Sequence, residues 1–147
     1  MEVGEILGIF LSKGYDVVSV DGSKEMCRLA GNYIGRDVCN ITFEELDYNN
    51  EFNAVWACAS LVHVEIGEIT GVLCKIQKLL KKKGILYASW KYGTGERIDN
   101  QKYYADYDEK GINELFSATS IKLIRKWVSE DSLIRSSKWL NVIGEKE

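Results

Sequence analysis

The sequence has little that points to a membrane, to export or to a metal. Among its 147 residues no apolar run approaches the roughly 20 needed to cross a bilayer. Met1–Glu5 carries no basic side chain, so the start of the chain does not resemble an export signal. The chain has one histidine and no C-x-x-C pair, which argues against a zinc site. Proline is absent too, and nothing about function follows from that.

The four cysteines are Cys27, Cys39, Cys58 and Cys74. Each lies in an apolar stretch of sequence, where a thiol packs as a small buried hydrophobe. Without an export signal, a reducing compartment is the expected environment for these thiols. We therefore expect buried cysteines in a cytoplasmic protein.

Charge is unevenly distributed along the chain. The net charge is −3, yet residues 1–60 carry 4 basic and 10 acidic side chains, whereas residues 61–147 carry 15 basic and 12 acidic ones. The basic half would favour an anionic substrate, or it simply forms a solvated lysine face, which is the more common case. Net acidity does not favour tight nucleic-acid binding, because neutralising phosphates requires clustered cations.

Apolar periodicity and turn residues predict an alternation of helices and strands in one domain, residues 1–147. A capping box at Thr42-Phe43-Glu44-Glu45 predicts a short helix there, and residues 91–107 are expected to form a loop. Such alternation favours an α/β fold with a mostly parallel sheet, closed by an antiparallel pair. The expected helices cover 5–12, 23–33, 69–80 and 108–116, and the expected strands cover 15–20, 37–41, 52–59, 85–90, 121–128 and 138–143.

Asp21 is the first residue with a chemical implication. It closes an apolar strand and precedes a small turn and a helix. In nucleoside-binding α/β units a carboxylate at that place accepts hydrogen bonds from ribose hydroxyls. The alternative is an exposed turn aspartate that bonds to its own backbone.

Several segments resemble class I S-adenosylmethionine-dependent methyltransferases in their order and spacing. The resemblance implies a Rossmann-like, mostly parallel sheet with helices on both faces and an antiparallel strand pair at the carboxyl end. One departure is that lysines replace the proline and first glycine of the family's L-K-P-G-G-x-L crossover. The matching segments are residues 14–23, 42–46, 52–64 and 78–87.

This resemblance implies roles for residues on the cofactor side. The carboxylate of Asp21 would hold the ribose of S-adenosylmethionine, and the next two residues would let the backbone approach the nucleoside. Two residues of the capping box would flank the adenine, and two residues after a strand would lie beside the methionyl portion. These implied cofactor residues are Asp21, Gly22, Ser23, Phe43, Glu44, Ala59 and Ser60.

On the acceptor side the resemblance points to His63 and to the segment after residue 90. His63 would act as a general base, or would shape the site or cap the next helix. Lys91, Tyr92 and Tyr103 would line the place where a flat acceptor stacks, although ordinary loop packing explains them equally well. The acceptor itself is not specified: a small molecule, a tRNA base and a protein side chain all remain open.

The family's first strand and its G-x-G-x-G loop have no counterpart here. Met1–Glu5 stands at the loop, and only Gly4 matches a loop glycine. The strands beside the missing central strand would carry unpaired backbone groups, which cost roughly 1–3 kcal/mol each when buried. We therefore expect a homo-oligomer, such as an intertwined dimer, and weakened cofactor binding.

Three functions are compatible with these patterns. The first is a methyltransferase, and the second is a non-catalytic relic of one that persists as a folded or interaction module. The third is a nucleotide-dependent oxidoreductase. It is the weakest, because no G-x-G-x-x-G is present and the terminal strand pair suits methyltransferases better.

Overall fold

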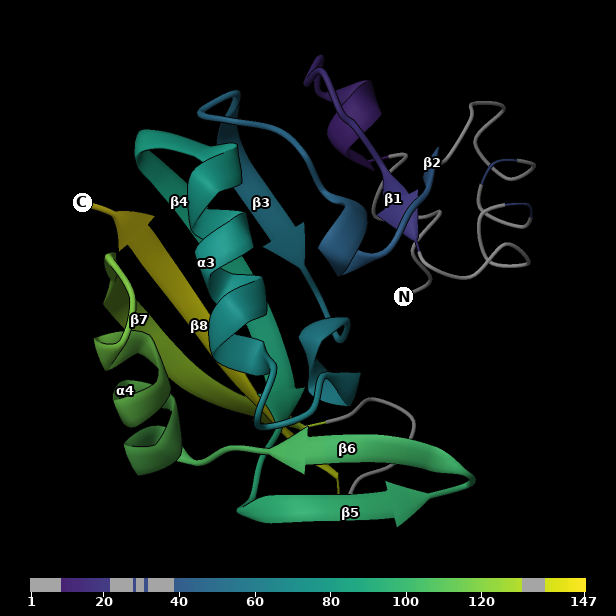
Figure 1. The fold of residues 1–147 in the computed structure, drawn as a ribbon, viewed down its shortest axis with the longest axis vertical. Coiled ribbons are helices and arrows are strands. Elements are labelled where there is room, and N and C mark those ends of the chain that lie inside the picture. Colours follow the sequence, from purple (N-terminus) through teal and green to yellow (C-terminus); the bar gives the residue numbers. More distant parts are fainter. Residues whose placement is uncertain (1–8, 22–27, 29–30, 32–38, 131–136) are drawn as a thin grey trace. The chain divides into compact units, whose positions relative to one another are not determined.

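A computed structural model describes residues 9–21, 28, 31, 39–130 and 137–147 of the chain. The chain divides into two compact units, Met1–Leu46 and Asp47–Glu147 (Figure 1). Each unit is described by itself below.

The first unit contains a short helical turn and a pair of parallel strands. Residues 9–12 are helical, and Gly14 ends the turn with a φ of 83°, a conformation that glycine adopts without strain. Strand β1 (Val20–Asp21) then pairs in parallel with β2 (Cys39–Asn40). The parallel pairing agrees with the expected α/β order.

The first expected strand is shorter than its sequence suggested. Within residues 15–20 only Val20 is in β1, and Tyr15 and Val18 are 61% and 45% exposed. Strands of parallel sheets are usually covered on both faces, whereas these two side chains are exposed to solvent. The helix expected over 23–33 lies largely outside the described residues, although Arg28 and Gly31 are helical.

The capping box forms as its sequence predicts. It begins the 3-10 helix η1 (Phe43–Glu45), where a Glu45 carboxylate oxygen accepts from the backbone N–H of Thr42 at 3.1 Å and from its hydroxyl at 3.0 Å. The first residue of η1, Phe43, is half-buried. A local signal of four residues was therefore enough to place this element.

The second unit is built on a mixed sheet in the order β3-β4-β8-β7. Strands β3 (Phe52–Ala57) and β4 (Leu80–Lys91) are parallel and are joined through helix α3 (Ile69–Leu79). Strand β8 (Lys138–Lys146) runs antiparallel to both β4 and β7 (Ile121–Glu130), which confirms the expected antiparallel closing pair.

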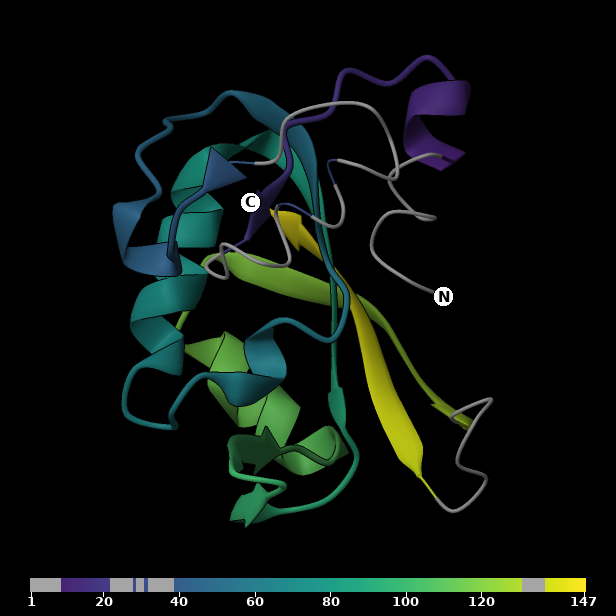
Figure 2. The ribbon, with the colours of Figure 1, turned by 90° about the vertical axis from the view of Figure 1, so that its right-hand side faces the viewer.

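One face of this sheet carries the hydrophobic core. Helices α3 and α4 (Glu109–Ser117) both lie on that face, as Figures 1 and 2 show. Asp108 caps the start of α4, where its carboxylate accepts from the Gly111 N–H at 2.8 Å, as its sequence predicted. No described helix is long and apolar enough to span a membrane. The core residues are Leu73 and Ile76 of α3, Leu86, Ala88 and Trp90 of β4, Ile112 and Phe116 of α4, and Leu140 and Val142 of β8.

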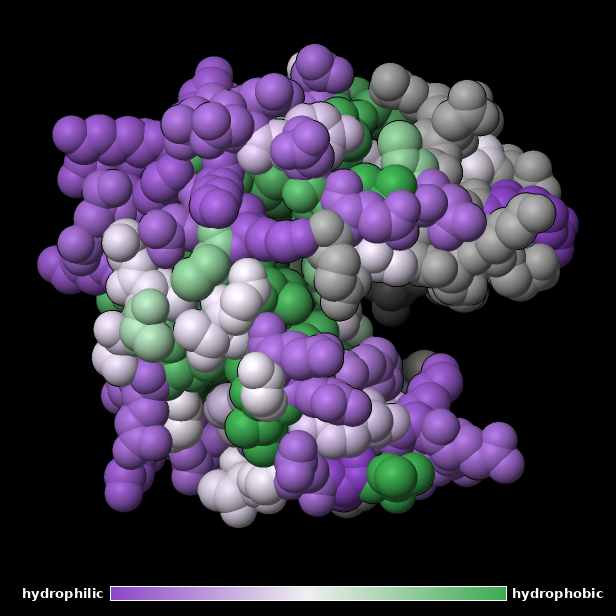
Figure 3. All heavy atoms as spheres, viewed as in Figure 1, coloured by the Kyte–Doolittle hydropathy of each residue, from purple (hydrophilic) through white to green (hydrophobic). Residues whose placement is uncertain are grey.

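Strand β4 begins five residues earlier than expected. Lys81, Lys82 and Lys83 belong to this strand and not to the end of α3, and all three are exposed. Figure 3 shows hydrophilic side chains gathered over this part of the unit. The pairing with β3 is irregular here, because Phe52 pairs with Leu80 and Ala54 already pairs with Ile85. The lysines are therefore solvated at the amino end of β4.

Two further expectations were wrong. Residues 91–107 contain a hairpin of β5 (Gly95–Asp99) and β6 (Lys102–Asp106), where a loop was expected. Its two turn residues, Asn100 and Gln101, have positive φ angles of 49° and 65°, as a type I′ turn requires. Three cysteines are also more accessible than expected, since Cys39 and Cys58 are exposed and Cys74 is half-buried, whereas Cys27 lies outside the described residues.

Candidate active site

The site begins at the carboxyl end of the parallel pair β3–β4, where open α/β sheets bind ligands. Strand β3 ends at buried Ala57, and the turn that follows, residues 58–60, is exposed. Ala59 in this turn has a φ of 52°, and its N–H donates to the Ser89 hydroxyl at 2.8 Å. A side chain thirty residues away therefore holds the backbone of this turn.

His63 is positioned by the short helix η2 (Leu61–His63) that follows the turn. Leu61 and Val62 are buried and anchor η2, whereas the imidazole of His63 is exposed. Its Nδ1 lies 2.8 Å from the carbonyl oxygen of Tyr103. Because a carbonyl only accepts, Nδ1 must carry the proton, and in the neutral ring Nε2 is then the atom with a lone pair.

Tyr103 joins the hairpin to this segment in a second way. Its phenol oxygen accepts from the Ile66 N–H at 3.2 Å and donates to a Glu96 carboxylate oxygen at 2.6 Å. Loss of hydration and then the bond to Glu96 raise the pKa of Tyr103, so the phenol stays protonated as a donor. Figure 1 shows β6 running beside the short helix that follows β3.

The neighbouring Tyr104 ring packs between His63 and Arg97. The imidazole meets this ring edge-on at 4.7 Å between centroids, and the Arg97 guanidinium lies 4.3 Å from its centre. Arg97 Nε donates to Asp106 at 2.8 Å, and this bond raises the pKa of Arg97. Because Asp99 lies 3.6 Å from the same guanidinium, the charge of Arg97 is balanced within the hairpin.

The other acceptor-side candidates point to different elements. Lys91 ends β4 with its Nζ 4.4 Å from the centre of the Trp139 ring. Tyr92 donates to Glu109 of α4 at 2.7 Å, and this bond raises the pKa of Tyr92. Of the three predicted acceptor-side residues, Tyr103 contacts His63, through its carbonyl oxygen.

The cofactor-side candidates are described only in part. Asp21 ends β1 with its backbone paired to Asn40, and its side chain lies outside the described part of the structure. Gly22 and Ser23 lie outside the described residues, and of Glu44 only the backbone is described. The roles of these residues, and those of Phe43, Ala59 and Ser60, stay predictions.

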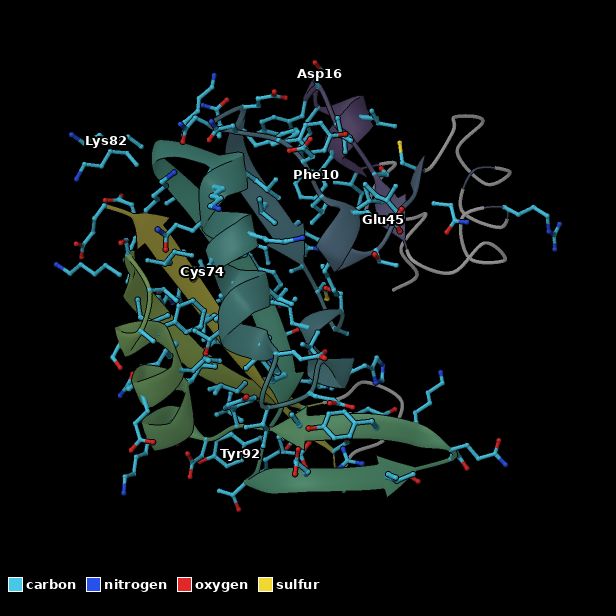
Figure 4. All side chains as sticks on the ribbon, in the orientation of Figure 1. Phe10, Asp16, Glu45, Cys74, Lys82 and Tyr92 are labelled. Atoms are coloured by element: carbon cyan, nitrogen blue, oxygen red, sulfur yellow. The ribbon has the colours of Figure 1, made fainter. Side chains whose placement is uncertain are left out.

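The described residues hold no cluster of three or more His, Cys, Asp or Glu side chains that could bind a metal. The most basic stretch of the second unit, Lys81–Lys83, is at the amino end of β4, whereas His63 follows the carboxyl end of β3. The lysine at its centre, Lys82, points into solvent in Figure 4. The lysines therefore do not line the segment around His63.

Sequence reasoning missed Ser89, Glu96 and Arg97. The last two lie on a hairpin whose turn has glutamine where glycine is the usual residue, so the standard hairpin signal was absent. Ser89 lies in the apolar part of β4, and its hydroxyl was the available signal because a buried polar group needs a partner.

Comparison with known proteins gives one family and many similar folds. The sequence model of one protein family, described as a methyltransferase domain, matches residues 3–88. No curated protein matches the chain in sequence. The fold is similar to 1,6-didemethyltoxoflavin-N1-methyltransferase of Burkholderia thailandensis, solved with 1,6-didemethyltoxoflavin and S-adenosylhomocysteine, at a TM-score of 0.81 and 21% identity over 95% of this chain. The chain spans 65% of the length of that protein.

Two other solved structures have similar folds. A SAM-dependent methyltransferase of Methanosarcina mazei gives a TM-score of 0.77 at 16% identity, over 94% of this chain and 85% of the other. Magnesium protoporphyrin IX methyltransferase of Synechocystis PCC 6803, solved with bound SAM, gives 0.76 at 13% identity, over 99% of this chain and 66% of the other. At these identities the likeness establishes the α/β fold.

Proposed function

Because the chain belongs to the methyltransferase domain family, we propose that it takes part in methyl transfer from S-adenosylmethionine to an acceptor bound beside His63. The observation that carries this proposal is the hydrogen bond from His63 Nδ1 to the Tyr103 carbonyl, at 2.8 Å. It turns the one histidine of the chain into a hydrogen-bond acceptor at Nε2, just past the end of β3. A methyl acceptor with an O–H or N–H group needs such a partner.

The residue types fit the parts of S-adenosylmethionine. A carboxylate residue, Asp21, ends a parallel strand, as binding of ribose hydroxyls requires. The half-buried ring of Phe43 offers an apolar surface of the kind that packs on adenine. The exposed turn at Ala59 and Ser60 offers backbone groups for the methionyl portion. Bound S-adenosylmethionine would supply a methyl group activated by its positive sulfur.

His63 would act as the general base of the reaction. Its Nε2 would accept the proton that the acceptor loses when it takes the methyl group. S-adenosylmethionine would supply that methyl group, with the carbon–sulfur electron pair left on sulfur. The Tyr103 carbonyl would stabilise the resulting imidazolium by accepting from Nδ1–H. The further contribution of the protein would be to align the acceptor with the methyl group.

Calorimetric titration with S-adenosylmethionine tests the cofactor half of the proposal. We expect saturable heat from the wild type and none from Asp21→Ala. The matched control is Asp16→Ala, which removes an exposed carboxylate from the same unit and should leave binding unchanged. Absence of heat from the wild type up to millimolar ligand contradicts the proposal and favours the non-catalytic relic.

The acceptor half is tested with 1,6-didemethyltoxoflavin, the molecule in the Burkholderia structure. The assay follows transfer of a labelled methyl group from S-adenosylmethionine. His63→Asn keeps an N–H near the position of Nδ1 but lacks the lone pair at Nε2, so kcat should fall about 100-fold or more while the KM for S-adenosylmethionine stays the same. A variant as active as the wild type would exclude His63 as the base.

The proposal also includes a second copy of the chain and a cytoplasmic location. Strand β3 pairs with β4 alone among the described strands, so its other edge is available to another strand. The exposed thiol of Cys58 suits a reducing compartment.

A further inference from the structure

Two polar side chains are buried among the described residues, Ser89 of β4 and Asn141 of β8, at 2% and 5% exposure. They face each other as paired residues of neighbouring strands. A buried polar side chain costs free energy unless its hydrogen bonds are made, so the partners of these two show how they are stabilised.

Their side chains bond to different partners. The Ser89 hydroxyl donates to Cys58 Sγ at 4.0 Å, and the Tyr87 phenol donates to the Asn141 amide oxygen at 2.5 Å. The Asn141 amide nitrogen donates to the Ser129 hydroxyl of β7 at 2.9 Å. Burial raises the pKa of Tyr87, with the nearby Cys58 as the next cause, which keeps this phenol protonated and able to donate.

The Ser89 hydroxyl also accepts a bond from the turn after β3. The Ala59 N–H donates to it at 2.8 Å. Ala59 has a φ of 52°, a left-handed conformation that costs a residue with a side chain roughly 1–2 kcal/mol. Such a conformation persists where surrounding contacts determine it, and here the Ser89 hydroxyl bonds to the amide of this residue.

We propose that Ser89 is a positioning residue that holds the turn at Ala59 in the shape that the methionyl portion of S-adenosylmethionine requires. This inference rests on the proposed function, which assigns that portion to Ala59 and Ser60. Ser89 does not touch the ligand. It acts through the amide of Ala59 and therefore affects one end of the ligand and not its adenosine end.

Two ligands separate this role from a general effect on folding. 5′-Methylthioadenosine contains the adenosine of S-adenosylmethionine but lacks the amino and carboxyl groups. Ser89→Ala leaves the Ala59 N–H without its partner, so we expect the affinity for S-adenosylmethionine to fall about tenfold. The affinity for 5′-methylthioadenosine should stay unchanged. Both affinities are measured by calorimetry.

Ser129→Ala is the matched control, because it removes a hydroxyl that bonds to Asn141 and not to the Ala59 amide. It should change neither affinity. If Ser89→Ala does not fold, Ser89→Cys replaces it, since a thiol is a weaker acceptor of similar size. Hydrogen exchange of the Ala59 amide gives a readout without ligand: protection should be lost in either Ser89 variant and kept in Ser129→Ala.

The outcomes are distinct. Equal losses of affinity for both ligands would make Ser89 merely structural and would overturn the inference. Unchanged S-adenosylmethionine binding, or unchanged Ala59 protection, in the Ser89 variants would overturn it as well. A wild type that binds neither ligand overturns the proposed function, and this inference with it.

Discussion

At the residue scale, the space around the backbone determines whether a glycine of the second unit can be replaced by a larger residue. Gly144 of β8 is one example, because a Cβ built there would lie 2.5 Å from Ile121 Cγ2 of β7. Gly71 of α3 is the opposite case, since nothing lies within 4 Å of a Cβ built on it. The same residue type therefore has contrasting effects at these two positions.

Alanine substitution at the two glycines should change stability in opposite directions. Gly144→Ala is expected to lower the free energy of unfolding by about 1–3 kcal/mol, because neighbouring side chains must shift to admit the methyl group. Gly71→Ala should raise it by up to about 1 kcal/mol, because alanine is the better helix former at an exposed position. Urea unfolding of both variants measures the two changes, and equal signs would contradict the packing described here.

The burial of Tyr87 predicts how stability depends on pH. Its pKa is raised from the ordinary value of 10.0, so the folded state holds this proton more tightly than the unfolded chain does. The corresponding stability is fully present below pH 10 and is lost as the pH rises above it. Tyr87→Phe should be less stable at neutral pH because Asn141 loses its donor, and its stability should fall less steeply above pH 10. Denaturant titrations across that range compare the two slopes, and parallel curves would refute the shift.

At the scale of elements, local signals in the sequence predicted the position of a helix where a capping residue or apolar spacing marks it. The cap at Asp108, the capping box at Thr42 and the apolar spacing of α3 each placed an element correctly. The start of β4 was misplaced, because three lysines after an apolar helix resemble a helix end. Here pairing with β3 determines the structure, and long-range pairing is not visible in a local window.

For the candidate site, the sequence identified some of the residues but not the geometry that holds them. His63 and Tyr103 were identified from their order in the family, and the structure brings them together. Their geometry depends on the β5–β6 hairpin, which was missed because Gln101 replaces the usual glycine of its turn. Ser89 could not be assigned a partner from sequence, because Ala59 lies thirty residues away.

The attachment of the hairpin to the segment after η2 is testable through Tyr103. Tyr103→Phe removes the bonds to Ile66 and Glu96 but keeps the backbone carbonyl that meets His63. Hydrogen exchange at the Ile66 amide should accelerate, while the free energy of unfolding falls by less than about 1.5 kcal/mol because these groups are largely exposed.

Tyr92→Phe is the matched control for Tyr103→Phe. It also breaks a phenol–carboxylate bond, in this case to Glu109 of α4. Exchange at Ile66 should be unaffected by it. If both variants accelerate this exchange equally, the effect is not specific to Tyr103 and the attachment lies elsewhere.

At the scale of the whole molecule, the two edges of the four-stranded sheet differ in their chemistry. Edge strand β7 carries Lys122, Arg125, Lys126 and Glu130, and its pairing is irregular between Leu123 and Arg125. Charges and bulges of this kind discourage pairing with other chains. Strand β3, at the opposite edge, has no charged residue. Its edge is therefore the one suited to receive another strand.

We expect the chain to form a dimer through this edge of β3. A lysine at the exposed position Ala54 should shift the population toward monomer, because it places a charge on the pairing edge. Ile124→Lys, at a 55% exposed position on β7, is the control and should leave the dimer intact. Light scattering gives the mass of each variant. A strictly monomeric wild type at all concentrations would end the proposal of a dimer.

The β5–β6 hairpin offers a way to retune which molecules this fold accepts. Beyond the pair Arg97–Tyr104 its tip, residues 98–102, is exposed, so pairs added there would extend the ribbon by roughly 3.4 Å per residue without disturbing its attachment. Under the proposed function, a series of tip lengths would test whether the hairpin limits the size of the acceptor. His63 and the four-stranded sheet would stay unchanged in this series.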